Sequence, residues 1–169
     1  MGCYEDAKAG EYYRFYRGEV RKLFACMTTT NAICFARNGS CAYFCDTQIG
    51  KIMRQKLAEK DGWPMGDPEI WLDFGDTSWG PDGAVIDTAG NLWNAQWGAN
   101  RIACYSPEGT LTQTIAFPAV QTSCPAFGGP NLKTLFCTSA AVGLIGKDDG
   151  KTFAIPVDAT GQAEHQIIF

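Results

Sequence analysis

Three side chains with oxygen donors occupy equivalent positions in an internal repeat. Asn31, Asp82 and Ser123 open the segments NAICFARNGSCAYFCDTQIGKIMRQ, DGAVIDTAGNLWNAQWGANRIACYS and SCPAFGGPNLKTLFCTSAA. The first two segments align without a gap, because Gly39 and Gly90 each follow the opening residue by eight positions. Amide and carboxylate oxygens suit a hard cation such as Ca²⁺, and a carboxylate-rich pocket with an open position also binds Zn²⁺. If the three side chains meet in space, they predict a divalent-cation site.

Each of these residues also has a purely structural interpretation. Asp82 stands in Pro-Asp-Gly, a common turn sequence in which the Asp side chain caps its own backbone. Asn31, in TTTNA, could cap a loop by binding neighbouring amides. Ser123 fits an ordinary strand entry and is the weakest ligand candidate. The residues alone leave these alternatives open.

Other chemistry has little support in the sequence. The single histidine, His165, lies near the C-terminus with no matching Ser or Cys constellation around it. Gly128, Gly129 and Pro130 precede strand-like residues, so they indicate a turn and not a phosphate-binding loop at a helix start. Trp97 ends a predicted strand, where it either packs in a sheet or walls a pocket.

The elements that must position the oxygen donors are short strands. Each repeat has a short apolar run, a turn built on Asn, Gly or Pro, and a second apolar run. The repeats begin 51 and 41 residues apart, close to the ~40 to 50 residues of a four-stranded propeller blade. We therefore predict an all-β fold, a partial, open β-propeller, with a β-sandwich as the alternative. In a propeller, equivalent positions on the innermost strands form a ring around the axis.

Composition limits the remaining possibilities. With 169 residues, 46% of them hydrophobic, we expect one domain over residues 1–169. The net charge of −4 is spread along the chain, which predicts no nucleic-acid partner. No run approaches the ~20 apolar residues of a membrane helix, and the first residues lack the order of a signal peptide. We expect a cytoplasmic protein whose eight cysteines, which form no CxxC motif, are reduced.

The sequence resembles the family of senescence marker protein (regucalcin), gluconolactonase and the luciferin-regenerating enzyme. The resemblance rests on NAICFARNGSCAYFCDT, GKIMR, PDGAVIDTAGNLWNAQWGANRIACYSPEG and SCPAFGGPNLKTLFCTSA. In addition, YYRFYRGEVRKLF is similar to the strand pair that precedes the metal-binding asparagine in that family. The match runs over nearly the whole chain.

The resemblance implies a fold, a metal and a reaction. Family members are six-bladed propellers that hold one divalent metal ion, and many hydrolyse sugar lactones. The family's metal-binding asparagine falls on Asn31, and its metal-binding aspartate, which is also the proposed general base, falls on Asp82. The implied mechanism has the cation polarise the lactone carbonyl while Asp82 takes a proton from the attacking water.

The sequence also departs from the family pattern. The family's further glutamate ligand, in a Gly-Glu-Gly-Pro-like segment of a longer chain, has no counterpart here. At ~40 to 50 residues per blade, we expect about three and a half to four blades of an N-terminally truncated relative. The expected function is metal-dependent hydrolysis of sugar lactones with Ca²⁺ or Zn²⁺. The alternative is a non-catalytic cation- or sugar-binding module that completes its ring by forming a homodimer or by binding a companion chain.

Overall fold

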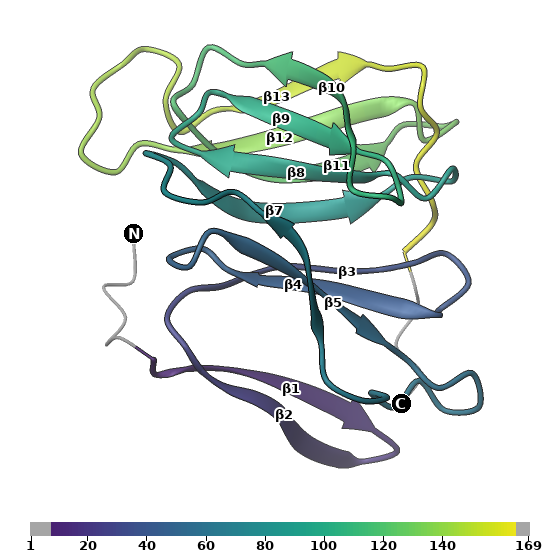
Figure 1. Cartoon of the computed structure of the whole chain (residues 1–169). Helices are drawn as coiled ribbons and strands as arrows, with labels where there is room; N and C mark the ends of the chain where they lie inside the picture. The colour runs from purple at the N-terminus through teal and green to yellow at the C-terminus, as the bar shows by residue number, and fades with distance from the viewer. Residues whose placement is uncertain (1–7, 165–169) are drawn as a thin grey trace.

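A computed structural model describes residues 8–164, which form thirteen β-strands and no helix (Figure 1). The strands are β1 (Gly10–Tyr16), β2 (Glu19–Met27), β3 (Thr30–Phe35), β4 (Cys41–Asp46), β5 (Lys51–Lys56), β6 (Glu69–Asp73), β7 (Gly80–Ile86), β8 (Leu92–Trp97), β9 (Arg101–Tyr105), β10 (Leu111–Ala116), β11 (Gln121–Gly128), β12 (Thr134–Ala140) and β13 (Thr152–Pro156). In this part of the chain, no helix is available to cross a membrane.

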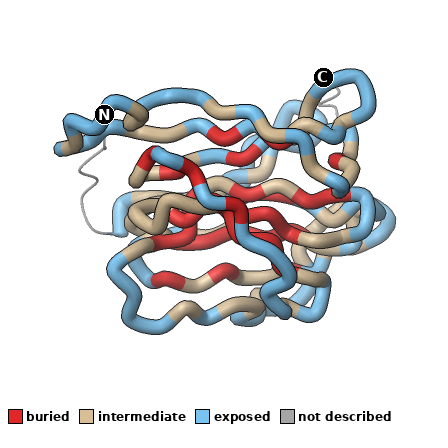
Figure 2. Tube along the Cα trace, turned by 90° about the horizontal axis from the view of Figure 1, so that it is seen from above, coloured by how far each residue is buried: buried red, intermediate tan, exposed pale blue. Residues whose placement is uncertain are grey.

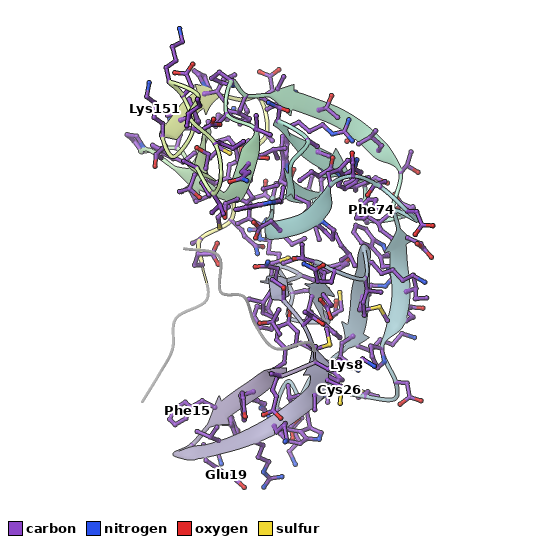
Figure 3. All side chains as sticks on the ribbon, turned by 90° about the vertical axis from the view of Figure 1, so that its left-hand side faces the viewer. Lys8, Phe15, Glu19, Cys26, Phe74 and Lys151 are labelled. Atoms are coloured by element: carbon purple, nitrogen blue, oxygen red, sulfur yellow. The ribbon has the colours of Figure 1, made fainter. Side chains whose placement is uncertain are left out.

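The strands form antiparallel sheets in chain order. β3 to β6 make the first sheet, and β1 and β2 form a separate hairpin. β7 to β13 are hydrogen-bonded as one seven-stranded sheet, which we divide where β8 meets β11 into a second sheet, β7 to β10, and a third sheet, β11 to β13. The third sheet is joined to the second by one residue pair, Gln121 with Trp97. Figure 3 shows the sheets following one another around a curve, from the hairpin that carries Phe15 and Glu19 to the third sheet near Lys151.

The first strand of each sheet lies innermost, as the repeat predicts. β7 contacts β3 on one side and β11 on the other, so the three strands lie side by side (Figure 1). Gly39 and Gly90, which align the first two repeats, both have positive φ, at 69° and 87°. Such a conformation favours glycine because it has no Cβ. The predicted all-β partial propeller is confirmed, and the sandwich alternative is wrong because the sheets follow one another around an axis.

The hydrophobic core lies between neighbouring sheets. Ala32, Cys34, Tyr43, Cys45 and Ile52 of the first sheet pack on Ala84, Ile86, Leu92, Ala103 and Tyr105 of the second. A second cluster joins Trp93, Ala95, Ile102, Cys104, Ile115 and Phe117 to Leu135 and Cys137 of the third sheet. Leu92 and Trp93 are consecutive but enter different clusters, because successive side chains of a strand point to opposite faces. Figure 2 shows buried residues along the inner strands and mostly exposed residues at the turns.

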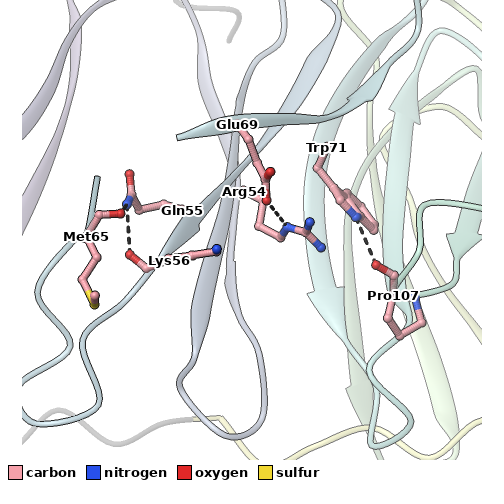
Figure 4. Close-up of polar contacts among 7 residues, drawn as sticks. All are labelled: Arg54, Gln55, Lys56, Met65, Glu69, Trp71 and Pro107. Carbon is pink, nitrogen blue, oxygen red and sulfur yellow. Dashed lines mark hydrogen bonds and ion pairs between the residues drawn. The ribbon is translucent and has the colours of Figure 1, made fainter. Parts of the chain in front are cut away.

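A polar contact also joins the first two sheets near their outer strands. The Trp71 indole on β6 donates a hydrogen bond to the carbonyl oxygen of Pro107, which follows β9, at 3.2 Å (Figure 4). The same indole packs edge-on against Tyr43, with ring centroids 4.8 Å apart. Beside it, Arg54 pairs with Glu69 at 2.8 Å across β5 and β6. These contacts hold the outer strand of the first sheet against the second sheet.

We expect Leu92→Ala to lower the free energy of unfolding by about 2–5 kcal/mol, because Leu92 is fully buried between two sheets and its truncation leaves a cavity. Chemical denaturation measures the loss. Leu111→Ala is the matched control, since Leu111 is 52% exposed, and its effect should stay within about 0.5 kcal/mol. Equal losses for the two variants would contradict a core between the sheets.

Candidate functional site

Asn31, Asp82 and Ser123 all lie on innermost strands, at or beside irregularities in strand pairing. The register shifts between Asn31 and Cys34 on β3, between Pro81 and Ala84 on β7, and between Thr122 and Cys124 on β11. Such a β-bulge re-aims a side chain that would otherwise alternate regularly along the strand.

The turn interpretation of Asp82 and the capped-loop interpretation of Asn31 are therefore wrong. Both residues belong to strands, β7 and β3. The sequence Pro-Asp-Gly is typical of a turn, but a β-bulge inside a sheet also tolerates proline and glycine. The sequence alone therefore does not distinguish the two. On β3, the residue after Asn31 has turn-like geometry, because Ala32 has φ 56° although it is not glycine.

Asn94 holds the bulge that carries Asp82. Its side-chain Nδ2 donates to the carbonyl oxygens of Asp82 and Gly83, each at 3.1 Å, and Asn94 itself is completely buried. Gly83 is required at this point, since an added Cβ would lie 2.8 Å from the sulfur of Cys124. The Asp-Gly pair thus allows β11 to approach the main chain of β7.

Asn31 is connected to the Asp82 strand through Thr47, which follows β4. The Asn31 side-chain Nδ2 donates to the Thr47 hydroxyl at 2.9 Å. The same hydroxyl donates to the carbonyl oxygen of Pro81, the residue before Asp82, at 2.8 Å. On the other side, the Tyr12 hydroxyl lies 2.6 Å from the Asn31 carbonyl oxygen.

Ser123 completes the connection between the three sheets. Burial raises the pKa of the Asp82 carboxyl to about 6, and hydrogen bonds from the Ser123 side chain and the Gly83 backbone partly oppose that shift. No cationic side chain of residues 8–164 is among the groups that shift this pKa. The structure therefore brings the three repeat positions together, through Asn31–Thr47–Pro81 and Asp82–Ser123.

Asp82 differs from the other buried aspartates in how it is bonded. The Asp46 carboxylate accepts hydrogen bonds from the backbone amides of Thr28 and Thr29 at 2.7 and 3.0 Å. The Asp87 carboxylate accepts bonds from the backbone amide of Asn91 and the indole of Trp93, both at 2.9 Å. These bonds explain Asp46 and Asp87 as structural residues.

The donor set around Asp82 fits a hard divalent cation. A buried carboxylate with no cationic partner is the kind of group that coordinates metal ions in proteins. Asn31 adds an amide oxygen of the type that Ca²⁺ accepts. Within the described residues, no three His, Cys, Asp or Glu side chains form a metal cluster. Asn31 and Asp82 would therefore bind the ion together with water or protein groups outside residues 8–164.

A cavity of about 310 Å³ lies beside this group of residues. Thr47 lines it together with Trp79 and Trp97. The cavity is formed by the β4–β5 turn and the segment that leads into β7, at the end of the sheets where β3 and β7 begin. Trp97 thus walls a pocket, which is one of the two roles expected from the sequence.

Sequence reasoning missed Thr47 and Asn94. Thr47 stands in an ordinary turn sequence, which gives no sign of its contacts in another sheet. Asn94 did carry a signal, because an amide inside the apolar strand Leu92–Trp97 needs buried partners. Gly129 lies in a turn, closed by a hydrogen bond from the Leu132 amide, as predicted. His165 lies outside the described residues.

The amino-acid sequence matches a known protein family and several curated proteins. The family model for the SMP-30/gluconolactonase/LRE-like region matches residues 1–141. A Rhizobium meliloti (strain 1021) protein, provisionally named a sugar lactone lactonase, is 38% identical over 173 aligned positions that cover 97% of this chain and 58% of that protein. The L-arabinolactonase of Azospirillum brasilense is 38% identical over 114 positions, covering 68% of this chain and 37% of that enzyme.

A solved structure shows the same arrangement of strands. The calcium-binding protein regucalcin from Agrobacterium tumefaciens superposes with a TM-score of 0.91 and 35% sequence identity, over 97% of this chain and 58% of that structure. The chain thus spans 58% of the length of both the Rhizobium protein and this regucalcin.

We expect Ser123→Ala to raise the pKa of Asp82 above its value of about 6, because the substitution removes a hydrogen bond that stabilises the ionised carboxylate. Carboxyl ¹³C NMR titration of chelator-treated protein measures this pKa directly. Ser106→Ala is the control, since the Ser106 hydroxyl bonds to Glu108 on another turn and should leave Asp82 unchanged. An unchanged or lower Asp82 pKa in Ser123→Ala would show that the Ser123 contact is absent in solution.

Proposed function

Because the chain belongs to the SMP-30/gluconolactonase/LRE-like family, we propose that it hydrolyses sugar lactones with one divalent metal ion held by Asn31 and Asp82. The observation that carries this proposal is the buried Asp82 carboxylate, which lies beside Ser123 and has no cationic side chain of residues 8–164 among the groups that shift its pKa. The matched lactonases support the reaction class. The oxygen donors and the calcium-binding regucalcin relative support Ca²⁺, with Zn²⁺ as the alternative ion.

Asp82 is suited to accept a proton. Its pKa of about 6 leaves it mostly ionised at neutral pH, and it is a stronger base than an ordinary Asp with a pKa of ~3.9. The Ser123 side chain favours the ionised form of the carboxylate and so limits the rise in the pKa of Asp82 that burial causes. Asn31 contributes its amide oxygen to the cation, while its amide nitrogen stays bonded to Thr47.

The reaction is the addition of water to a cyclic ester. Asp82 takes one proton from the attacking water, whose oxygen bonds to the lactone carbonyl carbon. The ring C–O bond then breaks, and the proton on Asp82 passes to the departing ring oxygen, which gives a hydroxy acid. When bound, the divalent ion supplies Lewis-acid stabilisation of the charge that develops on the carbonyl oxygen.

The competing hypothesis is a cation- or sugar-binding module without catalysis. The names of the matched relatives favour hydrolysis. The two hypotheses differ in one measurable property, because a binding module would take up Ca²⁺ or sugar and yet release no acid from a lactone.

We expect Asp82→Asn to lower the rate of lactone hydrolysis at least ~100-fold, since it removes the proton acceptor while preserving side-chain shape. Acid release from gluconolactone, followed by pH-stat, measures the rate, and calorimetry with Ca²⁺ and Zn²⁺ measures affinity. A chelator should abolish hydrolysis by the native chain. Asp148→Asn serves as the control, because Asp148 is remote from Asp82 in the sequence and forms an ion pair with Lys151, three residues away. The proposal fails if the native chain releases no acid, or if Asp82→Asn and chelator leave the rate unchanged.

We also propose that open strand edges let the chain pair with another protein segment, either a second copy or a companion chain. Among the described strands, β1 pairs only with β2 and β13 only with β12. Unpaired strand edges favour strand addition.

If a second copy pairs with these edges, the sedimentation coefficient of the purified chain should rise from the value for an 18.4 kDa monomer toward that of a dimer as concentration increases. Sedimentation velocity over a hundredfold range of concentration measures this change. A concentration-independent monomer would exclude self-association.

A further inference from the structure

The hydroxyl group of Thr47 is placed between two groups from different sheets. It lies 2.9 Å from Nδ2 of Asn31 on β3 and 2.8 Å from the carbonyl oxygen of Pro81 on β7. Thr47 itself is fixed by its backbone, because its amide donates to the carbonyl oxygen of Thr29 at 3.0 Å.

The number of protons at this hydroxyl determines how the Asn31 amide must be turned. A carbonyl oxygen can only accept a hydrogen bond, so the single proton of Thr47 goes to Pro81. The hydroxyl therefore faces Asn31 with a lone pair, which the amide nitrogen can meet and the amide oxygen cannot. The amide oxygen of Asn31 must consequently point away from Thr47.

Close packing keeps Thr47 in this position. Gly80 lies directly against it, and a Cβ added at Gly80 would come within 2.6 Å of the Thr47 methyl carbon. The Pro81 carbonyl oxygen has a second, weaker contact, because the Cys45 thiol lies 3.5 Å from it. If the Thr47 hydroxyl were removed, the Pro81 carbonyl oxygen on β7 would keep its contact with the Cys45 thiol. The Asn31 amide nitrogen would lose its hydrogen bond to Thr47.

We infer that Thr47 is a positioning residue that orients the Asn31 amide, so that the amide oxygen is presented for the divalent ion. The presentation to a metal ion rests on the proposed function, whereas the orientation of the amide follows from the hydrogen bonds alone. Thr47 acts through Asn31 and is not itself a ligand.

The first test is NMR of metal-free protein labelled with ¹⁵N-asparagine. The Asn31 side-chain signals are assigned from their loss in Asn31→Ala. In the native chain, one of the two Asn31 amide protons should show a small temperature coefficient and slow exchange with water, because it is bonded to Thr47. Thr47→Ser should preserve this signature and Thr47→Val should abolish it. The native measurement decides the question even if the valine variant fails to fold.

The second test is Ca²⁺ affinity by calorimetry. Thr47→Val should weaken binding by about 10- to 100-fold, the usual effect of losing a group that orients a metal ligand, and Thr47→Ser should restore it to within about threefold. Thr112→Val is the matched control, because the Thr112 hydroxyl also bonds to a backbone carbonyl, that of Cys104, but on the outer strands of the second sheet.

The outcomes separate this inference from the proposed function. A native-like Asn31 signature in folded Thr47→Val, or solvent-like Asn31 protons in the native chain, would overturn the orientation. If the native chain binds no Ca²⁺ or Zn²⁺ and yet Thr47→Val abolishes the signature, the orienting role of Thr47 stands and the metal-dependent function falls.

Discussion

The candidate site depends on one constraint, which is that β7 packs closely against Thr47 on one side and against β11 on the other. A Cβ at Gly80 would collide with Thr47, and a Cβ at Gly83 would collide with Cys124. A larger residue at either position would move β7 away from a neighbour, and would lengthen the hydrogen bond from Thr47 to Pro81 or separate Asp82 from Ser123. The two glycines therefore set the spacing across which the hydrogen bonds between the sheets are made.

The positions of the site residues could be predicted from sequence because they depend on local patterns. Turn residues such as Gly39 and Gly90 fix the repeat, and the repeat places Asn31, Asp82 and Ser123 on equivalent strands. Strand order then follows, since antiparallel neighbours joined by short turns pair in chain order. These steps need no knowledge of which side chains meet across the sheets.

The local geometry of the site could not be predicted in the same way. A bulge is defined by pairing with a partner strand, so Pro-Asp-Gly in isolation is indistinguishable from a turn. Thr47 contacts Asn31 and Pro81, which lie 16 and 34 positions away from it in the sequence. The residues next to Thr47 in the sequence predict neither contact. Burial of Asp82, which sets its pKa, likewise depends on packing between sheets and not on its neighbours in sequence.

Because each hydrophobic core is shared between two sheets, the sheets are not independent folding units. The second sheet contributes to both clusters, through Leu92 on one face and Trp93 on the other. Stability in such an arrangement is a property of the interfaces between successive units, as in repeat proteins. Substitutions on either buried face of the second sheet are therefore transmitted to a neighbouring sheet, which limits how freely both faces can vary as the sequence evolves.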